Sequence, residues 1–295
     1  MDEKKASPLR ESFQKAVLTS KARQLLDYEK TALAKRIEKR IKILDVDIDS
    51  FAVDEFLNNL NKGVVFTPNV DHLMRLREDQ EFVKAYDAAD YRVCDSQILL
   101  YASKFLGTPI RAKISGSDLF PMFCEHHRHN PEIKIFLLGG AEGIPQRAQE
   151  CINQRIGREI IVAAHSPSFG FEKDEAECQR ILDMIRSSSA NVLIVGVGAP
   201  KQEKWIAKYQ NQLPNIDIFM GVGAAIDFEA GNKPRAPRWV SEAGLEWLYR
   251  LMSEPRRLWK RYLLQDIPFV WLLLKQKMKR TFAPLDTSIN SIEAR

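Results

Sequence analysis

Short apolar runs recur along this chain at intervals that leave room for a helix between them. The segments between the runs, such as residues 70–89, have a helical pattern, and the runs begin near Ile43, Val64, Tyr91, Ile133, Ile160, Val192 and Ile216. Strands that alternate with helices form right-handed crossovers and a mostly parallel sheet that is covered on both faces. The pattern therefore predicts an α/β fold with a Rossmann-like sheet, in which ligands bind beyond the carboxyl ends of the strands.

The two ends of the chain differ in composition from this central part. Residues 1–40 are polar and lack the apolar stretch of a secretory signal. Residues 250–280 carry nine Lys or Arg against two acids, which indicates a basic helical appendage. We therefore predict a polar N-terminal extension (1–40), an α/β domain (41–244), the appendage (245–283) and a disordered polar tail (284–295).

Cysteine usage and hydropathy bear on the cellular location. The four cysteines lie far apart, with no CxxC pair and no histidine at metal-ligand spacing, so the sequence predicts a reducing cytoplasm and no zinc site. The longest apolar run, IPFVWLLL at 267–274, is much shorter than the roughly 20 residues that a spanning helix needs. Basic charge around this run favours a protein that lies on an anionic membrane surface without crossing it.

The most informative stretch for function is 221–262, which joins a glycine-rich strand end, a proline-arginine loop and a basic, tryptophan-containing helix. Small residues at a strand end let a ligand approach the backbone, and neighbouring cations suit an anionic ligand or surface. Other motifs precede this stretch in order: Thr67-Pro68-Asn69, Asp95, Gly107-Thr108-Pro109, SGSDL at 115–119, FLLGG at 136–140 and VGVGAPKQEKW at 195–205. With these motifs the chain resembles, over roughly residues 41–262, the WecG/TagA/CpsF glycosyltransferases, also called glycosyltransferase family 26.

The resemblance implies an inverting transfer of a hexose or N-acetylhexosamine-type sugar. The implied donor is a UDP-sugar, and the implied acceptor is a sugar on a polyprenyl diphosphate, in cell-surface polysaccharide biosynthesis at the cytoplasmic face of the membrane. Residues 41–244 would be the catalytic domain, with no cofactor and no nucleic-acid partner, and a homo-oligomer stays open. The donor sugar also stays open among N-acetylmannosamine, its uronic acid and glucose. Ser96 and Lys113, where the family usually has Gly and often has Arg, make a neutral hexose such as glucose worth testing.

Asp95 is the predicted catalytic base. It ends an apolar strand, where partial desolvation would raise its pKa and make it a better base for the acceptor hydroxyl. From the residues alone, a cap for the helix that begins near Gln97 is an equally good interpretation. The resemblance favours catalysis, because the family's proposed catalytic aspartate falls at this position. Thr67 and Asn69 around Pro68 look by themselves like an ordinary strand-to-helix junction, and the resemblance makes them site residues as well.

The predicted substrate-binding residues are of two kinds. Glycines at strand ends could bring backbone N–H groups to a diphosphate or let it approach, although no run is a full GxGxxG fingerprint; they are Gly139, Gly140, Gly196, Gly198, Gly221 and Gly223. Lys113 could neutralise phosphate as a point charge. Gln202 and Glu203 could contact uridine or the donor sugar, and the resemblance favours Gln202 above all. The plain alternative is an acid in the first turn of a helix, where the helix dipole favours it.

Cationic side chains are the predicted source of charge stabilisation. The resemblance implies that Arg250 and Arg257, two helical turns apart, complete the site over the leaving diphosphate. The competing interpretation assigns these cations to lipid headgroups. Asp45, Asp47 and Asp49 have the DxD spacing of metal-dependent glycosyltransferases, and alternation would place them on one face of the first strand. Because that strand precedes the first ligand loop, we predict no metal site.

Two other functions are alternatives to glycosyl transfer. A non-catalytic, membrane-associated scaffold with the same fold would have no need of a polar set such as Thr67, Asn69, Asp95 and Gln202. A soluble dinucleotide enzyme would require a complete glycine fingerprint and would leave the basic appendage unexplained.

Overall fold

The computed structural model describes residues 39–237, 239–240, 243, 245–253, 255–260 and 267–282. By its internal contacts the chain forms two units, 1–40 and 41–295, and only Lys39 and Arg40 of the first are described. The predicted N-terminal extension, apart from these two residues, and the predicted C-terminal tail therefore lie outside the described part.

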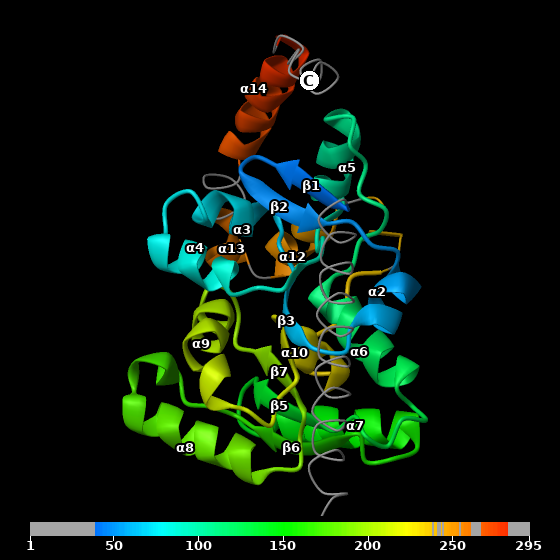
Figure 1. Ribbon diagram of the computed structural model, residues 1–295, viewed down its shortest axis with the longest axis vertical. Helices are drawn as coiled ribbons and strands as arrows, with labels where there is room; N and C mark the ends of the chain where they lie inside the picture. Colours follow the sequence, from blue (N-terminus) through cyan, green and yellow to red (C-terminus); the bar gives the residue numbers. More distant parts are fainter. Residues whose placement is uncertain are drawn as a thin grey trace, which may run out of the picture. The chain divides into compact units, whose positions relative to one another are not determined.

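A six-stranded sheet forms the centre of the second unit (Figure 1). Its strand order is β4-β3-β8-β7-β5-β6, and every pairing in it is parallel. The strands are β3 Gly63–Phe66, β4 Tyr91–Arg92, β5 Ile135–Gly139, β6 Ile161–His165, β7 Val192–Gly196 and β8 Ile218–Gly221. The predicted α/β, Rossmann-like fold is confirmed.

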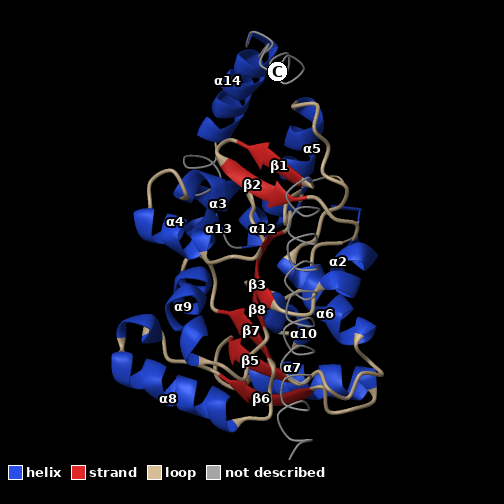
Figure 2. Cartoon of the chain, in the orientation of Figure 1, coloured by secondary structure: helices blue, strands red, loops and turns tan. Residues whose placement is uncertain are grey.

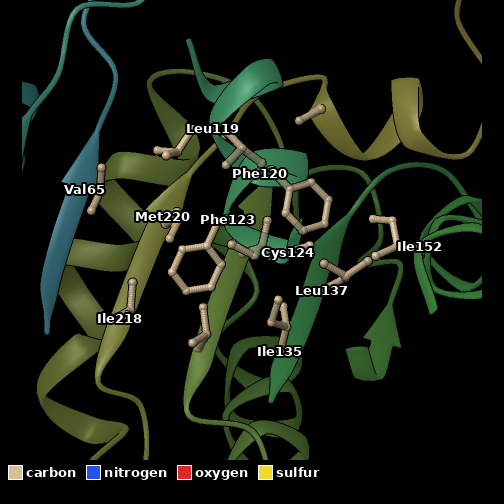
Figure 3. Close-up of a cluster of buried hydrophobic side chains, with 14 of the residues drawn as sticks. Val65, Leu119, Phe120, Phe123, Cys124, Ile135, Leu137, Ile152, Ile218 and Met220 are labelled. Atoms are coloured by element: carbon tan, nitrogen blue, oxygen red, sulfur yellow. The ribbon is translucent and has the colours of Figure 1, made fainter. Parts of the chain in front are cut away.

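Helices cover both faces of this sheet, because the strands bury alternate residues on opposite sides (Figure 2). In β3, Val65 belongs to one core cluster while Val64 and Phe66 belong to the other. Figure 3 shows the first cluster, where Phe120 and Phe123 lie against the sheet. The helices on that face are α2 Val53–Asn59, α6 Gly116–His126, α7 Ile144–Ile156 and α10 Ala225–Glu229. The other face is covered by α4 Gln80–Asp87, α8 Glu175–Ser187 and α9 Lys201–Tyr209, with the short turn η1 Phe171–Lys173. A second short turn, η2 Gln210–Gln212, follows α9 directly.

The first apolar run forms strands outside the main sheet. β1 Arg40–Ile43 and β2 Val46–Asp49 make a separate two-stranded sheet around the turn at Leu44 and Asp45. A single parallel bridge between Asp49 and Val93 links this hairpin to the end of β4. The hairpin therefore extends the sheet edge beyond the short strand β4.

The segment 70–89, which has a helical pattern, forms two helices. α3 Val70–Arg75 ends early, and α4 begins after Asp79, whose side chain accepts a hydrogen bond from the Phe82 N–H at 3.0 Å. A capping aspartate satisfies the exposed amides of a new helix and so favours a restart at this point.

Three helices form the C-terminal part of the described chain, and the last of them returns to its beginning. They are α12 Glu246–Ser253, α13 Pro255–Lys260 and α14 Pro268–Phe282. Figure 1 shows α14 next to the β1–β2 hairpin. Phe269 of α14 is buried in a third core cluster with residues of this hairpin, of α3 and of α5 Gln97–Phe105. Gln276 Oε1 accepts from the Leu44 N–H at 2.9 Å, and Gln276 Nε2 donates to the Lys42 carbonyl at 3.2 Å. In the part of the chain that is described, no helix has both the length and the apolar character to cross a membrane.

Candidate active site

The predicted site residues of the α/β domain gather where parallel strands end. Since parallel strands point the same way, their carboxyl ends meet at one edge of the sheet. The strands end in, or are followed by, Thr67 and Asn69 (β3), Asp95 (β4), Gly139 and Gly140 (β5), Gly196 and Gly198 (β7), and Gly221 and Gly223 (β8).

Asp95 and Asn69 contact each other across neighbouring strands. The Asp95 N–H donates to the Pro68 carbonyl at 3.0 Å, and Asn69 Nδ2 donates to Asp95 Oδ2 at 3.4 Å. Asn69 Oδ1 also caps α3 by accepting from the His72 N–H at 3.2 Å. The capping bond therefore fixes the Asn69 side chain at the start of α3, and its amide contacts the Asp95 carboxylate from that fixed position.

The alternative interpretation treats Asp95 as the cap of the next helix. α5 begins at Gln97, its N-cap residue is Ser96, and the Ser96 side chain forms no capping bond. Asp95 stands one residue before this N-cap position and is half-buried at the strand-end edge.

Lys113 lies beside the same strand end. The Ile114 N–H donates to the Cys94 carbonyl at 2.7 Å, which brings the segment with Lys113 against the residues before Asp95. Burial raises the pKa of the Cys94 thiol to about 12, with the charge of Asp95 adding to the rise and that of Lys113 opposing it. Both charges therefore act on one small region. Arg111, two residues earlier, forms an ion pair with Glu55 and donates its N–H to Ser50.

The glycine turns after β5, β7 and β8 pack backbone against backbone. A Cβ at Gly139 would stand 2.5 Å from the Gly196 carbonyl oxygen, and one at Gly196 would stand 2.8 Å from the Gly223 carbonyl oxygen. Gly139 also has a φ of 140°, which residues with side chains rarely adopt. These two strand ends therefore require glycine, because neighbouring backbone occupies the space of a side chain.

Gln202 holds two of these turns together. Its Oε1 accepts from the Gly198 N–H at 3.2 Å and from the Gly223 N–H at 3.1 Å, and its Nε2 donates to Glu203 Oε1 at 2.8 Å. These two backbone N–H groups thus have a partner inside the protein. A bound ligand would therefore contact the surface of the glycine turns without a hydrogen bond from the Gly198 or Gly223 N–H.

Glu203 lies at the centre of a buried polar group behind the sheet edge. Burial raises the pKa of its carboxyl to about 7, and the nearby charges of Asp71 and Arg75 on α3 act in opposite directions. Tyr86 of α4 also faces this group: its hydroxyl lies 2.6 Å from His72 Nδ1, and burial followed by the charge of Glu203 raises its pKa well above the ordinary value. Charges on the helix that Asn69 caps therefore act on the acid that follows Gln202.

Two further contacts at this edge were not anticipated from the sequence. Arg235 forms an ion pair with Asp118 and donates to the Ser117 carbonyl, so the proline-arginine loop (RAPRW, 235–239) meets the SGSDL motif. Phe169 is fully exposed, with the Lys201 ammonium 4.6 Å from its ring centroid. The motif positions gave a signal for the first contact, since both motifs were singled out, whereas no pattern marked Phe169.

The arginines of the predicted appendage lie on α12 and α13. The side chains of Arg250 and Arg257 are outside the described part of the structure, as is residue 254 between these helices. Their predicted role over a leaving diphosphate therefore stays a prediction.

The aspartates with DxD spacing are spread apart. Asp45 lies in the β1–β2 turn, not on a strand face, and is paired with Arg77 at 3.1 Å. Asp49 is buried and accepts from the Arg92 N–H at 2.7 Å. The expectation of one shared strand face is wrong for Asp45, because the strand begins only after it. Among the described residues, no three His, Cys, Asp or Glu side chains are grouped closely enough to hold a metal ion.

The fold is that of an α/β protein whose polar and glycine-rich strand ends gather at the carboxyl edge of a parallel sheet, the edge where ligands bind in this class of fold. Residues 41–283 match the model of the glycosyl transferase WecG/TagA/CpsF family, and the chain belongs to that family, as the motifs predicted. Similar proteins include the N-acetylglucosaminyldiphosphoundecaprenol N-acetyl-beta-D-mannosaminyltransferases of Staphylococcus aureus strains MW2, NCTC 8325 / PS 47 and COL. Each is 29% identical over 250 residues, which cover 81% of this chain and 94% of the relative.

Proposed function

We propose that this protein is an inverting glycosyltransferase that moves a hexose or N-acetylhexosamine-type sugar from a UDP-sugar to a polyprenyl-diphosphate-linked sugar in cell-surface polysaccharide biosynthesis. Family membership supports glycosyl transfer, and the names of the staphylococcal relatives support a lipid-diphosphate acceptor and an N-acetylhexosamine donor group. The observation that carries the proposal is the Asp95 carboxylate, held by Asn69 at the edge where the glycine turns gather.

Each proposed role follows from the position of the residue. Asp95 removes the proton of the acceptor hydroxyl, since it is half-buried at the strand-end edge and fixed by Asn69. The glycine turns after β7 and β8 receive the nucleoside diphosphate, because Gly198 and Gly223 leave open space where a side chain would otherwise project. Lys113 contributes positive charge beside the base.

The departing diphosphate needs additional positive charge. We assign this role to Arg250 and Arg257 of α12 and α13, in keeping with the excess of cations in residues 250–280. Substrate charge would then be balanced by side chains and not by a metal ion.

Replacing Asp95 by Asn tests the catalytic role. The amide keeps the shape of the side chain but cannot accept the proton, so turnover should fall by about 10²- to 10⁴-fold while the Kd for UDP stays the same. UDP release and product mass, measured with a panel of UDP-sugars and a lipid-linked monosaccharide, report both the rate and the donor. Asp87→Asn, which changes an exposed carboxylate on α4, is the matched control and should turn over normally.

Turnover of Asp95→Asn within about threefold of wild type would remove Asp95 from the mechanism. If the wild-type protein transferred none of the sugars while remaining folded and bound to membranes, the non-catalytic scaffold would be the better description.

We further propose that the protein lies on the cytoplasmic face of an anionic membrane through the outer side of α14. Phe269 and Gln276 face the protein core, whereas Val270, Trp271, Leu274 and Met278 are exposed, at spacings that place them together on the opposite side. Lys275 lies 5.2 Å from the Trp271 ring centroid. An apolar helix face edged by cations and a tryptophan is typical of interfacial helices.

Substitutions on this outer face test the membrane contact without disturbing the core. Trp271→Ser with Leu274→Ser should reduce binding to anionic vesicles by at least about tenfold, because two apolar side chains no longer enter the interface. Met184→Ser, which replaces an exposed apolar residue on α8, is the control. Equal vesicle binding by both variants would contradict the proposed surface.

A further inference from the structure

The Gln202 amide joins the ends of two strands only in one orientation. Its oxygen accepts from Gly198 beyond β7 and from Gly223 beyond β8, and its nitrogen donates to Glu203 Oε1. An inverted amide would set an NH₂ group against two N–H donors and a carbonyl against a carboxyl. Glu203 therefore favours the orientation that holds both turns.

Glu203 is a costly residue to place at this position. Its side chain is completely buried, and Oε2 has no hydrogen-bond partner among the described residues, although buried polar atoms nearly always have one. The dipole of α9 favours an acid in its first turn, yet burial outweighs this effect, since the pKa of Glu203 is raised to about 7. The helix dipole therefore does not explain why a glutamate stands at position 203. The hydrogen bond that this carboxyl accepts from Gln202 does explain it.

The space around the amide is matched to this arrangement. A Cβ at Gly221, the last residue of β8, would stand 3.0 Å from Gln202 Nε2. The glycine leaves the amide room to lie under the strand end. Glu203, Gln202 and Gly221 thus form one buried support beneath the turns.

We propose that Glu203 is a positioning residue for donor binding: by accepting from Gln202 it fixes the amide that holds the β7 and β8 turns at the spacing that receives a nucleoside diphosphate. Glu203 does not touch the donor, because it is buried behind the turns. The inference rests on the proposed function for the identity of that donor.

Calorimetric titration with UDP, together with KM and kcat for the UDP-sugar, tests this role in the full-length protein. Methionine has a similar size but no strong acceptor, so Glu203→Met should raise the Kd for UDP by about tenfold, the effect of one buried hydrogen bond. KM for the donor should rise in parallel while kcat changes little. Glu203→Gln keeps an acceptor oxygen and should stay within about threefold of wild type.

A double variant separates positioning from general loss of stability. If Glu203 acts through Gln202, then Gln202→Met with Glu203→Met should bind UDP no more weakly than Gln202→Met alone. Glu229→Met is the control, because it removes another buried carboxyl, which pairs with Arg155 at 2.8 Å. That variant should lower the melting temperature and leave the Kd for UDP unchanged.

The inference is wrong if folded Glu203→Met binds UDP as tightly as wild type, if the two substitutions add, or if Glu203→Gln binds as weakly as Glu203→Met. In each of these cases the wild-type protein binds UDP, so the proposed function stands. Wild-type protein that binds neither UDP nor a UDP-sugar would refute the proposed donor and this inference together.

Discussion

Replacing Glu203 by Gln should change how the stability of the protein depends on pH. Burial raises the pKa of this carboxyl from 4.5 to about 7, so the folded state holds a proton that the unfolded chain releases earlier. The free energy of unfolding therefore falls as pH rises through this range. The loss of stability is absent below pH 4.5 and complete above about pH 7. At about 1.4 kcal/mol for each pKa unit, the full loss is about 3 kcal/mol.

The variant lacks this titration. At pH 5 the wild-type carboxyl is neutral in the folded state, so wild type and Glu203→Gln should have similar free energies of unfolding. At pH 8 the wild type carries a buried charge, and Glu203→Gln should be more stable by up to about 3 kcal/mol. Urea unfolding followed by tryptophan fluorescence at pH 5, 6.5 and 8 measures both free energies.

Other groups also titrate in this pH range. Their contributions cancel when the unfolding free energy of wild type is subtracted from that of Glu203→Gln. Burial lowers the pKa of His127 to about 4 and lowers that of His165, which makes the fold more stable as pH rises. Neither histidine is among the groups that act on Glu203, so each contributes equally to wild type and variant. A difference in unfolding free energy that stayed constant within about 0.5 kcal/mol from pH 5 to 8 would refute the reasoning.

Three further predictions follow from the site. Gly196→Ala puts a Cβ 2.8 Å from the Gly223 carbonyl oxygen, so it should destabilise the protein by about 2 kcal/mol and weaken UDP binding; an unchanged melting temperature would show that the turns can move apart. Transfer activity should survive EDTA, because diphosphate charge is assigned to side chains, and a loss that Mg²⁺ or Mn²⁺ restores would overturn that assignment. Arg257→Ala should lower turnover of a soluble acceptor analogue but weaken vesicle binding by only about 1 kcal/mol, and high salt should not rescue the rate. Normal turnover with lost vesicle binding would make Arg257 a membrane anchor.

The sheet and its ligand edge could be predicted from the sequence because both depend on local pattern. Runs such as Val64 to Phe66 are apolar on both faces and end in small or polar residues, which is typical of buried parallel strands. Gly139 and Gly196 mark strand ends because close backbone packing tolerates no side chain there. The predicted position of the site follows from these two signals.

Partners at long sequence separation could not be predicted in this way. The run at Ile43 has the apolar pattern of a strand, but the pattern does not say that its partners are β2, α5 and the distant α14. Glu203 has the appearance of an exposed first-turn acid, yet it is completely buried on α9, the helix against which α4 packs. Local periodicity contains no information on either contact.

The docking of α14 on the first hairpin has a consequence for the order of folding. During synthesis the strand with Ile43 leaves the ribosome long before Phe269, which fills the same core cluster. The hairpin must therefore wait, with part of its apolar surface uncovered, until the segment 268–282 has emerged. Docking of α14 closes the third core and at the same time fixes which side of this helix faces outward, the side that we assign to the membrane.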